Sequence, residues 1–150
     1  KTERNDRAAA RHLGVRKAMI GAGLDPETLQ IIQTNYDIND GADAFETLMN
    51  SPARPTAVLC GNDVLAVGAL RRARELNIAV PKDISIVGFD DIELSQVTYP
   101  ALTTVRVPHH EMGKQAAIAL AMHVNQGTPI EAVALKTRPV LRGTLGPAPK

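Results

Sequence analysis

The sequence predicts an α/β fold built on a doubly wound, mainly parallel sheet. Two observations indicate this fold. Short apolar segments with strand character alternate with amphipathic helical segments, and this order is typical of a parallel sheet that has helices on both faces. In addition, residues 57–60 are apolar without interruption, as is typical of a strand that is covered on both faces.

Each expected element has its own start and stop signals. Asn5 or Asp6 can cap the first helix, Pro52 and Pro55 end the second, and Asn77 ends the third. We expect helices near residues 6–22, 41–50, 64–76 and 111–125, and strands at residues 29–34, 56–60, 84–89 and 102–106. Residues 132–141 alternate in polarity and are expected to be extended, and the Gly- and Pro-rich residues 143–150 are expected to form a frayed tail.

The composition is that of a globular domain without a nucleic-acid-binding face of its own. The 150 residues are 44% hydrophobic and 22% charged, with a formal net charge of +1, which argues against a disordered chain. The densest basic cluster, Arg71, Arg72 and Arg74, is typical of a solvated helix face. With 2 Tyr, 2 Phe and no Trp, the chain has too few aromatic residues for a base-stacking surface.

Cysteine usage and hydropathy favour a cytoplasmic protein. The single cysteine, Cys60, cannot form an intrachain disulfide and is expected to be a small buried apolar residue. The sequence has neither a signal peptide nor an apolar stretch of the ~18 residues that a membrane-spanning helix needs. Because the chain opens on Lys1 without an initiator methionine, we expect it to be a fragment.

Polar residues follow three successive expected strands. They are residues 35–37 (Asn-Tyr-Asp), residues 62–63 (Asn-Asp) and residues 90–91 (Asp-Asp). Ligands of open parallel sheets bind beyond the carboxyl ends of the strands, and carboxylates, amides and one aromatic ring suit a polyhydroxylated small molecule. Asn and Asp also cap helices, so Asp63 alone is equally consistent with a cap, and a cap or solvent position is favoured for Asp37 and Asp91.

Other chemistries have little support in the sequence. The adjacent His109 and His110 point in different directions and have no partner at metal-ligand spacing. The neighbouring Asp90 and Asp91 diverge at a strand end, unlike an acid/base pair that flanks a bond. The sequence has no nucleophile elbow, phosphate loop or Cys/His dyad. We therefore predict a binding protein without enzymatic activity, metal or cofactor.

Residues 54–113 closely resemble the LacI/GalR family of transcriptional regulators. The pieces that carry the resemblance are RPTAV, GNDVLAVGAL, VPKDISIVGFDD and P-x-LTTV, with NDRAAARHLGVRKAM before them and LKTRPVLRGT after them. The resemblance implies the C-terminal lobe of a two-lobed fold like that of a periplasmic binding protein. It also implies that residues 107–126 are a crossover and a helix that belong to the N-terminal lobe, and that the DNA-binding domain is absent from this chain.

The resemblance also assigns candidate site residues. Arg11 matches the arginine that reaches the effector, Tyr36 the aromatic residue that stacks on it, and Asn62 or Asp63 together with Asp90 the polar cleft positions. Val107 departs from the family, where several members have a polar residue, so the identity of the effector stays open. In the family, the helix at 64–76 and residues 94–99 form a twofold dimer interface, which here gives Leu65, Ala66, Ala69, Leu94 and Tyr99.

The function implied is that of a cytoplasmic repressor that senses a small sugar-like effector. It would bind operator DNA as a homodimer, through a domain outside this chain. The alternative is a periplasmic sugar-binding protein of a transport system, which shares the fold and the cleft. The resemblance further implies a strand before residue 6, which the charged residues 1–4 cannot replace. We therefore expect residues 1–150 to be either the remnant of a longer chain or a fragment stabilised by exchange with a second copy.

Overall fold

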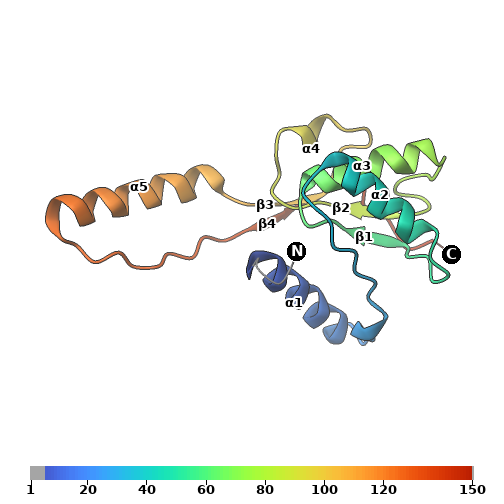
Figure 1. Ribbon diagram of the computed structural model, residues 1–150, viewed down its shortest axis with the longest axis horizontal. Coiled ribbons are helices and arrows are strands. Elements are labelled where there is room, and N and C mark those ends of the chain that lie inside the picture. The colour runs from blue at the N-terminus through green and yellow to red at the C-terminus, as the bar shows by residue number, and fades with distance from the viewer. Residues whose placement is uncertain (1–5, 150) are drawn as a thin grey trace.

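The computed structural model describes residues 6–149 and consists of short strands flanked by helices (Figure 1). The elements in chain order are α1 (Asp6–Gly21), η2 (Pro26–Thr28), α2 (Ile38–Met49), β1 (Ala57–Leu59), α3 (Asp63–Glu75), β2 (Ser85–Val87), α4 (Leu94–Val97), β3 (Thr104–Arg106), α5 (His109–Gln126) and β4 (Arg138–Val140). The α/β class is therefore confirmed, and the expected helices are present with boundaries shifted by a few residues.

The strands form a parallel core with one antiparallel addition. β1 and β2 pair in parallel, with Val58 opposite Ile86. The other edge of β2 meets the segment that leads into β3, through a parallel bridge between Val87 and Thr103. β3 then pairs with β4 in an antiparallel ladder. β2 therefore lies between β1 and the β3 segment, and the carboxyl ends of all three strands lie at the same edge.

The core lies between this sheet and the helix pair α2 and α3. Its buried residues come from α2 (Phe45, Met49), α3 (Ala66, Ala69, Ala73), the β2 region (Ile84, Ile86) and Leu102. The two helices approach closely because glycines face the neighbouring backbone. A Cβ at Gly68 would lie 2.0 Å from the carbonyl oxygen of Ile38, and one at Gly41 would lie 2.4 Å from that of Leu65. Any side chain at either position would force the helices apart.

The prediction of a strand at residues 29–34 is wrong. These residues are coil, and no described strand pairs with them. The side chain of Gln30 donates a hydrogen bond to the carbonyl of Ala53, but the apolar side chains of Ile31 and Ile32 are exposed. A strand requires ladder hydrogen bonds to a neighbour, so the β-branched sequence alone does not produce one here.

The C-terminal third has two different parts. α5 and the extended return at residues 128–137 project away from the body of the molecule (Figure 1), and α5 buries none of its residues. The expectation of a frayed tail from Gly143 is wrong for residues 143–146. Thr144 is fully buried, its hydroxyl donates to the carbonyl of Ile86, and its oxygen accepts from the amide of Thr103. This segment therefore closes the sheet between β2 and the approach to β3.

Candidate functional site at the carboxyl edge of the sheet

Arg11 joins α1 to the carboxyl edge of the sheet through three contacts. Its guanidinium donates a hydrogen bond to the carbonyl of Gly61, directly after β1. It also lies 3.6 Å from a carboxylate oxygen of Asp90 and 3.8 Å from the ring centroid of Phe89, both of which follow β2. Charge pairing and stacking on an aromatic face suit the planar guanidinium. Two of the predicted site residues, Arg11 and Asp90, are thus in contact.

Asp90 and Asp91 have backbone conformations that L-residues rarely adopt. Their φ angles are 114° and 59°, and non-glycine residues with such values are uncommon and cost energy. The neighbouring chain keeps Asp90 in place, because its amide donates to the carbonyl of Val105 at 2.9 Å and its carbonyl accepts from the amide of Val107. The strained turn aims the two carboxylates in different directions, toward Arg11 and toward the interior.

Asp91 is an internal anchor of the loop that follows β2. Its side chain is 2% exposed and forms ion pairs with Arg106 and Arg142. Burial by itself would raise the pKa of Asp91, but hydrogen bonds and charge from Arg142 and Arg106 outweigh it and lower that pKa. Ser95, on α4, also donates to the Asp91 carboxylate. Asp91 therefore links α4 to β3 and to the C-terminal segment. Its role is structural, and it does not lie in solvent.

Asp63 is also buried, contrary to the simplest form of a direct cleft contact. It is fully buried, and its carboxylate accepts hydrogen bonds from the Thr104 hydroxyl at 2.6 Å and from the Ile92 amide at 2.9 Å. Burial raises the pKa of Asp63, and these hydrogen bonds oppose the rise only in part. A Cβ at Gly88 would meet the same carboxylate at 2.1 Å. Asp63 thus stabilises the carboxyl edge of the sheet from a buried position, through Thr104 and Ile92.

Asn62 and Tyr36 lie at the edge beside Gly61. Asn62 is the N-cap of α3, because its side-chain oxygen accepts from the amide of Leu65 at 2.9 Å. Tyr36 precedes the Asp37 cap of α2 and has an exposed ring. A Cβ at Gly61 would lie 3.7 Å from the Tyr36 ring. The structure therefore brings Tyr36 close to the strand end that Arg11 contacts, although the strand expected before Tyr36 does not form.

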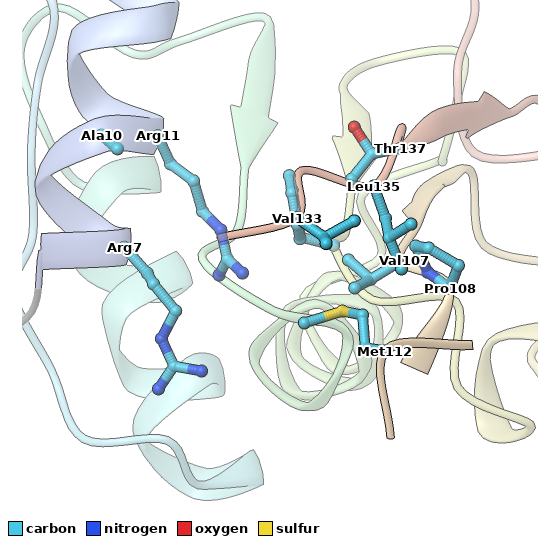
Figure 2. Close-up of a pocket in the computed structure, with 10 residues that line it drawn as sticks. Arg7, Ala10, Arg11, Val107, Pro108, Met112, Val133, Leu135 and Thr137 are labelled. Carbon is cyan, nitrogen blue, oxygen red and sulfur yellow. The ribbon is translucent and has the colours of Figure 1, made fainter. Parts of the chain in front are cut away.

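A pocket of about 320 Å³ lies beside Arg11, between α1 and the crossover after β3 (Figure 2). Its lining consists of Arg7, Ala10, Arg11, Phe89, Val107, Pro108, Met112, Val133, Leu135 and Thr137. The volume is at the small end of the range for ligand sites, and a mainly apolar wall with a few polar groups is the usual lining. Val107, the apolar departure from the family pattern, is part of this wall.

Sequence reasoning missed several of these lining residues. Arg7 lies one helical turn before Arg11, so the helical repeat of α1 could have identified it. Phe89 immediately precedes Asp90, and its place at a strand end was also a signal. Leu135 and Thr137 reach the pocket from the extended return that follows α5. No local pattern could have placed them there.

The remaining chemistry of the described residues is limited. Burial, and secondarily the charge of Asp63, raises the pKa of Cys60 to about 12, so its thiol is protonated at neutral pH. Within residues 6–149, no group of three His, Cys, Asp or Glu side chains is placed to hold a metal ion. Among the helices of that same range, none is long and apolar enough to cross a membrane.

The residues expected at a dimer interface fall into two classes. Leu65, Ala66 and Ala69 are buried within the chain, where α3 packs against α2 and the sheet. They present little surface to a second copy, and their place in an interface stays a prediction. Leu94 and Tyr99 are exposed, Tyr99 at 98%, and Val97 between them is 76% exposed. The surface formed by Leu94, Val97 and Tyr99 is the α4 patch.

The comparison with known proteins identifies the family. The periplasmic binding protein-like domain family matches residues 1–145. The chain belongs to this family. The ribose operon repressor of Escherichia coli strain K12 is 37% identical over 128 residues, which cover 85% of this chain and 38% of the repressor. The HTH-type transcriptional repressor PurR of Photorhabdus laumondii is 40% identical over 106 residues, which cover 71% of this chain and 31% of that protein.

The structural comparison agrees with the sequence comparison. A LacI-family transcriptional regulator from Enterococcus faecium with bound ribose has a TM-score of 0.88 and 28% identity, covering 93% of this chain and 52% of that one. The resemblance to LacI/GalR regulators and the periplasmic-binding-protein-like fold are confirmed. The relatives are transcriptional regulators and not enzymes by their names. The chain spans less than two fifths of the length of these curated relatives.

Proposed function

We propose that this chain is the effector-sensing and dimerisation part of a transcriptional repressor that responds to a small sugar-like molecule. One observation carries the proposal: Arg11 and Asp90, from elements 79 positions apart in the sequence, meet at the carboxyl edge of the sheet beside a pocket of about 320 Å³. The named relatives, a ribose operon repressor and PurR, support the class of protein.

The geometry suits a polyhydroxylated ligand. The carboxylate of Asp90 accepts hydrogen bonds from hydroxyl groups, and the guanidinium of Arg11 donates to hydroxyl or ring oxygens. Phe89, which Arg11 covers, and Tyr36 supply flat apolar faces at the same edge. Asp63 positions this edge through Thr104 and Ile92, and is assigned no direct contact.

Mechanistically, the strained turn at Asp90 links the ligand to the crossover. The backbone of Asp90 is hydrogen-bonded to Val105 and Val107, immediately before α5 begins at His109. A ligand held by Asp90 therefore acts on the segment that sets the direction of α5. It shifts the equilibrium between two lobe arrangements only if it binds them with different affinities.

A homodimer and a DNA-binding domain outside this chain complete the proposal. Recognition of operator half-sites by such domains requires a symmetric dimer, and the exposed α4 patch is the surface that we assign to it. The protein would act in the cytoplasm. The second candidate, a periplasmic sugar-binding protein, shares the fold but lacks DNA binding. The sequence upstream of this chain distinguishes the two, because one requires a helix-turn-helix and the other a secretion signal.

The test uses the full-length protein and its operator fragment. Fluorescence anisotropy of the labelled operator is recorded with increasing protein, with and without each member of a panel of pentoses, hexoses and purines. We expect one class of small molecule to change the operator affinity at least tenfold, which corresponds to about 1.4 kcal/mol of coupling. A protein that binds a sugar but has no DNA affinity at low salt would support the periplasmic alternative.

A further inference from the structure

Two arginines point from one face of α1 into the candidate site. Arg7 and Arg11 are four residues apart on α1, so they lie on the same side of the helix. Both line the pocket, and in Figure 2 the Arg11 side chain extends toward Val133 and Met112 while that of Arg7 lies farther along α1. Like charges at this helical spacing repel each other. Arg7 is exposed, and a negative charge placed beside the pair would relieve this repulsion.

The described residues provide compensation for only one of the two. Arg11 lies 3.6 Å from the Asp90 carboxylate. Within residues 6–149, no ion pair and no hydrogen bond joins the Arg7 side chain to a carboxylate. The lining contains two arginines and neither Asp nor Glu. His109, whose Nε2 lies 4.0 Å from the Asp90 carboxylate, can only add positive charge. Among the described residues, the lining therefore has one arginine, Arg7, without a carboxylate partner.

The rest of the lining is mainly apolar, with hydrocarbon from Val107, Pro108, Met112, Val133 and Leu135. A ligand that covered this wall would exclude water from it and so strengthen charge pairing at the two arginines. A neutral sugar would satisfy Asp90 and Arg11 but would leave the Arg7 guanidinium without an anionic partner. An anionic group on the ligand would pair with Arg7, and the planar guanidinium fork suits carboxylate and phosphate oxygens.

We infer that the effector is an anionic sugar derivative, either a sugar phosphate or a sugar acid, whose charged group pairs with Arg7. In the same bound position, the sugar hydroxyls would form hydrogen bonds with Asp90 and Arg11. This inference rests on the proposed function and narrows its ligand class. It makes Arg7 the residue that determines specificity for charge, while Arg11 and Asp90 recognise the sugar itself.

The experiment compares matched ligands on full-length protein by isothermal titration calorimetry. The probes are pentoses and hexoses in three forms: the neutral sugar, its terminal phosphate and its aldonic acid, with inorganic phosphate as a separate arm. The variants are Arg7→Gln, which removes the charge, and Arg7→Lys, which keeps it. Arg74→Gln is the matched control. Arg74 is exposed on α3, outside the pocket lining, and its substitution also removes one positive charge.

We expect one anionic form to bind at least tenfold more tightly than its neutral parent. Arg7→Gln is expected to weaken that form about 10- to 100-fold and to leave the neutral parent unchanged, Arg7→Lys to retain part of the difference, and Arg74→Gln to retain all of it. The phosphate and acid arms identify which anion is used. A neutral sugar that binds best, with an affinity unaffected by Arg7→Gln, overturns this inference while the proposed function stands. Failure of every sugar form to bind overturns both.

Discussion

The hydroxyl of Thr104 donates a 2.6 Å hydrogen bond to the carboxylate of Asp63, across 41 positions of the sequence. Both residues are buried, and the second oxygen of the same carboxylate accepts from the amide of Ile92. One side chain at the start of α3 therefore holds the loop after β2 and the strand that leads to the crossover. The carboxyl edge of the sheet is a single hydrogen-bonded unit, and the candidate site is built on it.

Removing the Asp63 carboxylate is expected to destabilise the fold. Asp63→Ala leaves the part-buried amide of Ile92 and the buried hydroxyl of Thr104 without their acceptor, a loss that costs about 1–3 kcal/mol. Asp63→Asn can keep both contacts, because its amide oxygen accepts from Ile92 while its amide nitrogen donates to Thr104, and is expected to cost less. Urea unfolding of the full-length protein gives both values. Equal stability of the Ala variant and the parent would contradict this role.

The pH dependence of stability is expected to have opposite signs at Asp63 and Asp91. Burial raises the folded-state pKa of Asp63. Its stabilising contribution is therefore complete below the unfolded value of about 3.9 and is lost as pH rises through the folded-state pKa. Arg142 and Arg106 lower the pKa of Asp91, so its contribution is present above the unfolded value and is lost as pH falls through the folded-state pKa.

These signs can be read from unfolding free energies measured between pH 2.5 and 7. The advantage of the parent over Asp63→Asn is expected to shrink as the pH rises. Its advantage over Asp91→Asn is expected to shrink as the pH falls. Two parallel curves for parent and variant would show that the corresponding carboxyl has the same pKa in the folded and unfolded states.

The α4 patch is expected to control dimerisation of the full-length protein. Val97 and Tyr99 are 76% and 98% exposed, and burial of such side chains in an interface contributes about 1.5–3 kcal/mol each. Val97→Lys with Tyr99→Lys is expected to raise the dimer dissociation constant at least tenfold and to weaken operator binding. Sedimentation velocity measures the first effect. As a control, Leu13→Lys changes an exposed apolar residue of α1 and should leave the dimer intact.

The chain of residues 1–150 is expected to self-associate when it is expressed alone. Exposed apolar side chains gather on α5 (Met112, Ile118, Leu120, Met122, Val124), and Leu59 of β1 is also exposed. In addition, β1 pairs only with β2 among the described strands, so its other edge carries unpaired backbone groups. Light scattering coupled to gel filtration tests this. A monomer with a sharp cooperative unfolding transition at micromolar concentration would contradict the expectation.

The sequence predicted those features that depend on local pattern. The periodicity of α2 and α3, the cap at Asp37 and the strand β1 are local, and each is found. The expectation that β1 is covered on both faces is wrong, because Leu59 is 51% exposed. The strand at 29–34 failed because a strand also needs a partner, which no local pattern guarantees. Predictions of which residues are buried failed for the same reason, because burial also depends on residues distant in the sequence. Asp63 and the small residues of α3 are equally compatible with a surface or an interior until the packing of α2 and the position of Thr104 are known.

The candidate site was predictable to the same extent. Parallel strands deliver their carboxyl ends to one edge, so the grouping of Asn62 and Asp90 followed from strand order. Tyr36 lies near them although the strand expected before it does not form. The contact between Arg11 and Asp90 required the family resemblance, since α1 precedes β2 by more than sixty residues. The role of Asp91 as an internal anchor depends on Arg142, near the other end of the chain. No reading of neighbouring residues could supply that pairing.

The most direct test of the central claim is the affinity of the full-length protein for its effector when Asp90 is changed. Asp90→Ala removes the carboxylate that lies beside Arg11, a residue of the pocket lining, but leaves Asp63, Asp91 and the α4 patch in place. Loss of a hydrogen bond to a charged group costs about 1.5–3 kcal/mol, so calorimetry is expected to show affinity lowered about 10- to 100-fold, with operator binding in the absence of effector retained. An effector affinity equal to that of the parent would contradict the account.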